Sequence, residues 1–456
     1  MTGASVPGLV TSLAIPTIFT MLISAFYNMA DTFFVARLGT GAAAAVGIVF
    51  SVMSFIQAVA FMVGIGCGST VSRALGAQDN TKADRIGSSA FLMALCFGAL
   101  LALTGLVFPV PLMRMLGSTD TILPYSVSYA GYIFWGAPVL CCSIVLNNIL
   151  RAEGKAILAT IGLGFGGLLN VALDPLFIFK FNMGISGAAA ATLLSQCVSF
   201  GILFAFFRTG KTITRLSPRF VSTSVRDYLR ILGLGSSSFC RQGLAGISTV
   251  ALNVGAGGYG DAAVAAMSIV GRIFFFVLAA LIGFGQGFQP VAGYNYGAEK
   301  FDRVRAAFNF TVRTGTIFLT AIAVIGFIFA PQVVGLFRVG DPAVLAIGAA
   351  ALRAQCLALP LQPLIVLSNM LFQSIGKASQ AVFISSTRQG IYFIPLILLL
   401  PTKFGLNGLL ATQPLSDLLA FLSCLPFLWC FFRSLRLTEA PGCERNNVSV
   451  PKSVSD

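Results

Sequence analysis

Three acidic residues, Asp31, Asp174 and Asp417, lie inside long apolar stretches of the sequence, where a charge is costly. Tyr27 precedes Asp31 by four residues, and Asn170 precedes Asp174 by the same spacing, so each pair shares one face of a helix. An ionisable side chain at the centre of a bilayer costs about 2.5–3.5 kcal/mol on insertion scales and is functional by default. The two N-terminal aspartates are therefore the first candidates for chemistry.

We predict that Asp31 and Asp174 take up a cation. No basic residue in the N-terminal apolar stretches is placed to neutralise them, so a proton or a metal ion must do so. The chain contains no histidine, which leaves a carboxylate as the natural proton carrier. The alternative is structural: each acid is satisfied by Tyr, Asn or Thr side chains inside a helix bundle.

The C-terminal half shows the opposite balance of charge. Arg241, Arg272, Arg353 and Arg388 lie in or near apolar stretches there, with only Asp417 as a partner. We predict that Arg241, Arg272 and Arg388 line a substrate cavity that binds an anionic or zwitterionic group. Arg353 better fits the alternative, in which a long side chain near a helix end extends its charge to the membrane surface.

Membrane-spanning helices must position these residues. Hydrophobic residues make up 57% of the 456 residues and charged residues only 10%, whereas an average soluble domain is about 25% charged. This composition excludes a secreted, nucleic-acid-binding or disordered protein. A helix crosses a bilayer with about 20 apolar residues. The sequence predicts an all-α integral membrane protein with twelve spans, at 10–35, 42–72, 87–112, 122–150, 157–180, 186–207, 229–254, 262–292, 307–337, 344–374, 378–401 and 406–432.

Basic residues set the expected orientation. With both termini in the cytoplasm, the inside segments hold 20 Lys and Arg residues and the outside loops hold 5, Arg338 among them, as the positive-inside rule requires. The segment 1–7 carries no basic residue, so we expect no signal peptide. We interpret the ten cysteines as small core hydrophobes, since none forms a metal-type CxxC pair. We therefore expect a multi-pass protein of the cytoplasmic (inner) membrane.

The chain also carries an internal repeat. The segment 39–79 aligns with 260–300 without a gap, with twelve identities in 41 positions, and the same register places Asn148 on Asn369, with one residue inserted further on. A duplicated unit of six helices enters the membrane in the same orientation each time, which is typical of transporters with a cavity between the halves. The predicted parts are an N-lobe at 1–207, a basic cytoplasmic linker at 208–228, a C-lobe at 229–432, and a cytoplasmic tail at 433–456 in which 440–456 is disordered.

From Leu9 to Phe432 the sequence resembles the multidrug and toxic compound extrusion (MATE) family. The segments that carry the resemblance are Pro16, Tyr27-Asn28-Met29-Ala30-Asp31-Thr32, Arg37-Leu38-Gly39, the run from Asn170 to Pro175, the run from Gly283 to Pro290, and Tyr294-Asn295-Tyr296-Gly297-Ala298. The resemblance implies two six-helix lobes that form a V around a central cavity. It also implies export driven by a proton or sodium gradient.

The same resemblance assigns roles in the N-lobe. It implies a cation site formed by Asp31, Asn170, Asp174 and Thr192, a hinge of the first helix at Pro16, and further polar groups of the same network at Tyr27 and Asn147. Some members also carry acids on helices 7 and 10, and this chain has none there, so it resembles the branch that relies on the N-lobe acids. The ligands are all oxygens, which suit Na⁺. The branch and the helix 1 proline favour H⁺.

The leading functional hypothesis is a monomeric antiporter in the lipid bilayer that exports amphipathic small molecules in exchange for H⁺ or Na⁺. It requires no cofactor and no nucleic acid. The second hypothesis is a flippase for a lipid or lipid-linked saccharide, whose phosphate the basic C-lobe would hold, and the third is a channel. An enzyme or an ATP-driven pump is not expected. A phosphate-binding loop ending at Gly210-Lys211-Thr212 would need glycine where Ala205 stands.

Overall fold

The computed structural model describes residues 2–336 and 341–439, and these form helices joined by short connections. The first half contains α1 (Val6–Ala36), α2 (Thr40–Gly76), α3 (Asn80–Val107), α4 (Pro109–Met115), α5 (Leu123–Ala152), α6 (Ala156–Pro175), η1 (Leu176–Lys180) and α7 (Ile185–Arg208). The second half contains η2 (Pro218–Phe220), α8 (Val225–Gly257), α9 (Asp261–Gly297), α10 (Phe301–Ile328), α11 (Ala330–Gly335), α12 (Pro342–Ala358), η3 (Leu359–Leu361), α13 (Gln362–Ile375), α14 (Ala378–Ser386), η4 (Thr387–Ile391) and α15 (Phe393–Glu439). The expectations for Arg338, Cys443 and the tail 440–456 lie outside the described residues.

The predicted number of membrane crossings agrees with the helices. Ten segments of the described chain are long and apolar enough to span a membrane. The last of them, Ala378–Leu435, contains Gly405 with φ 58°, where one helix ends and another begins, so it provides two crossings. Helix α8 is also long enough, at 33 residues, but polar residues in its middle, Arg241 and Gln242 among them, lower its hydropathy. With these two additions the described part of the chain has twelve crossings, as predicted.

Two predicted spans are wrong at both ends. The span at 87–112 corresponds to α3, which is Asn80–Val107. The sequence predicts a helix over 307–337, whereas α10 begins at Phe301 and ends at Ile328. The error has a simple cause, because Arg303 and Arg305 in the first turns of α10 have the polarity of a loop. The C-terminal end of α10 lies just before Pro331, a residue that cannot continue a helix. Pro331 lies in the first turn of the next, short helix α11.

The two halves repeat each other closely. Helices α9 and α10 begin and end at the positions that the repeat pairs with the ends of α2 and α3. Asn147 Nδ2 donates to the carbonyl of Ala159 at 2.9 Å, and Asn369 Nδ2 donates to the carbonyl of Ala381 at 2.6 Å. The counterpart of Asn369 is therefore Asn147 and not Asn148 as the sequence predicted. The inserted residue comes earlier in the chain, before these asparagines.

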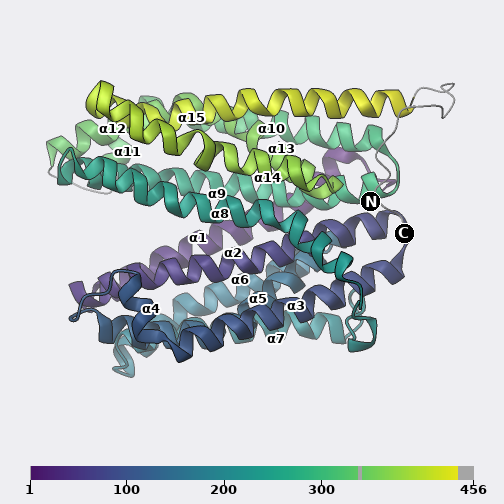
Figure 1. Cartoon of the computed structure of the whole chain (residues 1–456), viewed down its shortest axis with the longest axis horizontal. Helices are drawn as coiled ribbons and strands as arrows, with labels where there is room; N and C mark the ends of the chain where they lie inside the picture. The colour runs from purple at the N-terminus through teal and green to yellow at the C-terminus, as the bar shows by residue number, and fades with distance from the viewer. Residues whose placement is uncertain (1, 337–340, 440–456) are drawn as a thin grey trace.

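Helices α1 and α2 of one lobe lie against α9 and α8 of the other (Figure 1). Glycines in these helices allow close backbone approach. A Cβ added to Gly66 of α2 would lie 2.0 Å from a carbonyl oxygen of α8, and one added to Gly235 of α8 would lie 1.7 Å from a carbonyl oxygen of α2. A Cβ added to Gly287 of α9 would lie 2.4 Å from the Cα of Ala14 in α1. The repeat relates these contacts, because its register places Ala14 on Gly235 and Gly66 on Gly287. A pseudo-twofold interface thus joins the lobes.

The linker between the lobes is fastened to the N-lobe. Glu153, whose side chain is fully buried, accepts the backbone N–H groups of Ile213 and Thr214 at 2.9 and 2.7 Å and pairs with Lys155 Nζ at 3.1 Å. The backbone N–H of Arg215 donates to Asp84 at 2.7 Å. Carboxylates of the N-lobe thus hold a segment that has no helix of its own to satisfy its backbone.

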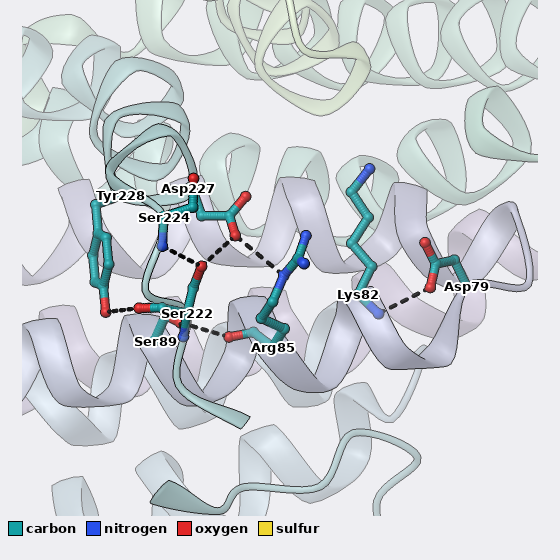
Figure 2. Close-up of polar contacts among 8 residues, drawn as sticks. All are labelled: Asp79, Lys82, Arg85, Ser89, Ser222, Ser224, Asp227 and Tyr228. Atoms are coloured by element: carbon teal, nitrogen blue, oxygen red, sulfur yellow. Dashed lines mark hydrogen bonds and ion pairs between the residues drawn. The ribbon is translucent and has the colours of Figure 1, made fainter. Parts of the chain in front are cut away.

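The end of the linker bridges α3 and the first turn of α8 (Figure 2). The N–H of Ser222 donates to Ser89 Oγ at 2.8 Å, and Ser222 Oγ donates to Asp227 Oδ2 at 2.7 Å. The same carboxylate oxygen of Asp227 pairs with Arg85 Nε at 3.1 Å. Asp227 in the first turn of α8 is therefore held by Ser222 of the linker and by Arg85 of the N-lobe.

Candidate functional site

A glycine-rich helix brings the predicted acidic residues of the N-lobe together. A Cβ added to Gly166 of α6 would lie 1.8 Å from Ser199 Oγ of α7, and one added to Gly167 would lie 3.3 Å from the ring of Tyr27 in α1. Helices α7 and α1 therefore approach α6 on neighbouring faces. This packing places Asp31 of α1 and Thr192 of α7 on the side of α6 that carries the predicted acid and amide.

Three of the four predicted cation-site residues form one hydrogen-bonded group. Asn170 Nδ2 donates to Asp174 Oδ1 at 3.3 Å and to Thr192 Oγ1 at 3.2 Å. All three side chains are buried, and Asp174 is fully so. The four-residue spacing of Asn170 and Asp174 thus places them together as the sequence predicted, and the contact with α7 is added by packing.

The fourth predicted residue, Asp31, is connected to this group by Tyr129, which the sequence did not single out. Tyr129 of α5 is fully buried, and its hydroxyl donates to Asp31 Oδ2 at 3.2 Å. The same hydroxyl also lies within electrostatic range of Asp174 and Thr192, so Tyr129 is near both acids. A signal existed in the sequence: a tyrosine in the middle of an apolar span needs a partner for its hydroxyl.

Several oxygen atoms of this cluster lack a hydrogen-bond partner. Within the described chain, the buried atoms Asp31 Oδ1, Asn170 Oδ1, Asp174 Oδ2 and Ser195 Oγ make no hydrogen bond. The four ion pairs found between described residues involve none of these side chains. A buried acceptor without a donor is costly. An arrangement of oxygens alone, with two carboxylates and no base, fits a proton or a hard cation.

The other N-lobe predictions lie outside the hydrogen-bonded cluster. Pro16 lies within the continuous helix α1, and its carbonyl accepts Thr160 Oγ1 at 2.9 Å and Thr20 Oγ1 at 3.0 Å. Tyr27 packs against Gly167. Asn147 binds the carbonyl of Ala159, which lies well before Asn170 on α6. Asn147 therefore ties α5 to α6 away from the acids.

The C-lobe arginines lie in different surroundings. Arg388 Nε pairs with the buried Asp417 Oδ1 at 2.7 Å, and Gln413 Nε2 donates to the same oxygen at 3.0 Å. Arg241 is half-buried and lies within electrostatic range of Arg388. Arg272 is exposed. The C-lobe therefore holds one buried ion pair with a second cation beside it, and Arg272 is not part of this cluster.

Two lobes of six membrane-spanning helices, with a buried acidic cluster in one and an arginine cluster in the other, define a polytopic membrane transporter. The MatE family model matches residues 16–176 and 241–399 of the chain. The chain therefore belongs to the MATE family, which confirms the resemblance found in its motifs. It is a multi-pass membrane protein and a transporter rather than an enzyme.

Curated relatives and solved structures agree over nearly the whole chain. The multidrug export protein MepA of Staphylococcus saprophyticus is 24% identical over 428 residues, which cover 94% of each chain. MepA of Staphylococcus aureus (strain MRSA252) is 24% identical over 414 residues, or 90% of this chain and 91% of MepA. A crystal structure of a MATE protein in complex with MaL6 is 27% identical with a TM-score of 0.90, covering 96% of this chain and 98% of its own. An outward-facing multidrug resistance MATE transporter has the same identity and coverage and a TM-score of 0.89.

Proposed function

We propose that this protein is a cation-coupled antiporter that exports amphipathic small molecules by alternating access of its two lobes. The relatives MepA are multidrug export proteins. The observation that carries the coupling mechanism is the buried cluster of Asp31, Asp174 and Tyr129, in which two carboxylates share a hydroxyl neighbour and no base. Such a site must bind an exchangeable cation to be neutral inside a membrane.

The residues divide the work as follows. Asp31 and Asp174 accept the cation, Asn170 holds Asp174 against α7 through Thr192, and Tyr129 keeps Asp31 oriented toward the same site. Cation loading removes the charge repulsion between the two acids and so changes the packing of α1 on α6. A ligand shifts a conformational equilibrium only by its differential affinity for the two states. We propose that H⁺ is the coupling ion, with Na⁺ as the alternative at the same oxygens.

Arg241 and Arg388 are proposed as the substrate contact in the C-lobe. Asp417 pairs with Arg388, and Arg241 lies within electrostatic range of Arg388 without a carboxylate of its own among the ion pairs of the described chain, so an acidic or zwitterionic substrate would supply the missing negative charge. Arg272 completes the predicted set, but its exposure makes it the comparison position in the test. The proposed transporter is a monomer of the cytoplasmic membrane with both termini in the cytoplasm.

The proposal is tested by substrate-induced collapse of an imposed pH gradient in everted membrane vesicles. A panel of amphipathic cations and anions is added to wild type, to Asp31→Asn and to Asp120→Asn, an exposed loop acid paired with Arg114, as the matched control. We expect collapse in wild type and Asp120→Asn and none in Asp31→Asn. Collapse that Asp31→Asn retains would refute coupling through this site, and a response that requires added sodium would identify Na⁺ as the ion.

The same panel tests the C-lobe contact. We expect Arg241→Ala to lose the acidic compounds selectively, whereas Arg272→Ala keeps the wild-type pattern. Equal export of anions and cations by Arg241→Ala would refute the substrate contact. If neither ion supports a response to any compound, the lipid or lipid-linked-saccharide flippase becomes the leading interpretation, and transbilayer movement of labelled phospholipid in the same vesicles would then be measured.

A further inference from the structure

A small cavity whose lining includes several polar side chains lies between the lobes, away from the acidic cluster. Its volume is about 20 Å³. The N-lobe helices α2 and α5 and the C-lobe helix α9 supply its lining, which consists of Ile65, Gly68, Ser69, Ser72, Asn148, Arg151, Ala152, Gln286, Gln289 and Pro290. A cavity holds a water molecule when its volume exceeds about 10–15 Å³. This one therefore has room for a single small species.

The lining includes a buried guanidinium group whose charge is not neutralised. Arg151 is 6% exposed. Its Nη2 donates to Asn148 Oδ1 at 3.0 Å and its Nη1 donates to Gln286 Oε1, both neutral acceptors. Its Nε is buried without any acceptor, and no carboxylate of the described chain forms an ion pair with Arg151. A buried cation without a counter-charge is strongly unfavourable.

Nothing nearby in the described chain compensates this charge. Glu153 follows Arg151 by two residues, but its carboxylate is committed to Lys155 and to the backbone of Ile213 and Thr214. The C-terminal dipole of α5 favours a cation in the last turn, but this effect is weak compared with the cost of an unpaired buried charge. The site therefore lacks one negative charge.

We propose that the cavity is a binding site for a monovalent inorganic anion of the halide class, with chloride as the physiological ligand. The Arg151 guanidinium supplies the charge. The Ser69 hydroxyl, which makes no hydrogen bond to other described residues, and the second N–H of the Gln289 amide supply neutral donors. Sulfate, phosphate and organic acids are larger than the single small species for which this cavity has room. The site therefore selects a monatomic ion by size.

The position of the cavity gives the anion a structural consequence. Arg151 and Ser69 belong to the N-lobe and Gln286 and Gln289 to the C-lobe, so the ion is held by both. A ligand that binds one arrangement of the lobes stabilises that arrangement in proportion to its occupancy. Chloride would thus hold the lobes in the packing seen here. The inference is independent of the proposed antiport, because binding is measured at equilibrium without transport.

The test is thermal unfolding of the full-length protein in lipid nanodiscs, with chloride titrated against gluconate at constant ionic strength. Wild type and Arg353→Gln, an exposed arginine on α12 as matched control, should show a saturable rise in the unfolding midpoint. Arg151→Gln should lose this response or require at least about tenfold more chloride, and Arg151→Lys should keep part of it. An equal response in Arg151→Gln, or none in wild type, would overturn the proposal.

A second measurement does not depend on a variant that must fold. Wild-type crystals grown in bromide should show anomalous scattering from one ion within hydrogen-bonding reach of the Arg151 guanidinium. Density at this cavity without an anomalous signal would identify a water molecule only, which refutes an anion site. A bromide elsewhere on the chain and none at Arg151 would refute it as well.

Discussion

The contact between α2 and α8 at Gly235 gives a prediction that geometry alone determines. In Gly235→Ala the new Cβ would lie 1.7 Å from the Met62 carbonyl oxygen. Real Cβ atoms do not approach closer than 3.0 Å, so the two backbones must separate by more than an ångström. Overpacking of this kind lowers the free energy of unfolding by about 1–3 kcal/mol. The loss for a Cβ that clashes with backbone lies at the upper end of this range, because no side chain can rotate away.

Gly243→Ala on the same helix is the matched control. A Cβ at Gly243 meets nothing within 4 Å, and replacing a helical glycine by alanine is favourable by about 1 kcal/mol. The two identical substitutions should therefore act in opposite directions. We expect the thermal midpoint of purified Gly235→Ala to fall below wild type and that of Gly243→Ala to equal or exceed it.

The Gly235→Ala variant should also change the balance between conformations. Because Gly235 lies at the interface of the lobes, the strain is relieved when the lobes separate there, and labelling of a cysteine placed at Ser236 should become faster. A Gly235→Ala protein as stable as Gly243→Ala, with unchanged labelling, would show that the lobes do not depend on this close approach.

Two further predictions concern buried polar contacts. Asn147→Ala removes the donor to the carbonyl of Ala159, and Asn369→Ala removes the donor to the carbonyl of Ala381. Each substitution should lower the free energy of unfolding by about 1–3 kcal/mol and lower the thermal midpoint by a similar amount. Markedly unequal losses would contradict the equivalence of the two asparagines in the repeat. Arg388→Gln leaves the buried carboxylate of Asp417 without its cation and should lower the free energy of unfolding by about 3–5 kcal/mol. The double variant Arg388→Gln with Asp417→Asn should recover part of this stability. No recovery would show that the pair does not act as a unit.

The spacing of residues along the sequence predicted those contacts of the site that lie within one helix. Asn170 and Asp174 are four residues apart and are hydrogen-bonded, as the shared helix face of an i, i+4 pair allows. Tyr129 could not be assigned from its sequence, because its partner Asp31 is almost one hundred residues away and the contact depends on how α5 packs beside α1.

The balance of basic and acidic residues predicted the orientation of the chain, but it did not predict which residues contact each other across the lobes. Arg151 is one of the 20 basic residues that the sequence assigns to the cytoplasmic segments, whereas the structure buries it against Gln286 of the other lobe. Hydropathy treats an arginine after an apolar span as an interfacial anchor. Only the packing of two lobes, which a single span does not encode, removes it from the surface.

The attachment of the linker limits how far the lobes can part. The backbone of the linker is bound to the N-lobe as far as Ser222, and α8 begins at Val225. Only Thr223 and Ser224 lie between, so the Cα atoms of Ser222 and Val225 are three residue steps apart, a reach of at most about 10–11 Å. The first turn of α8 therefore acts as a fixed pivot, and any wide opening at this end must either swing around it or break the pair between Arg85 and Asp227.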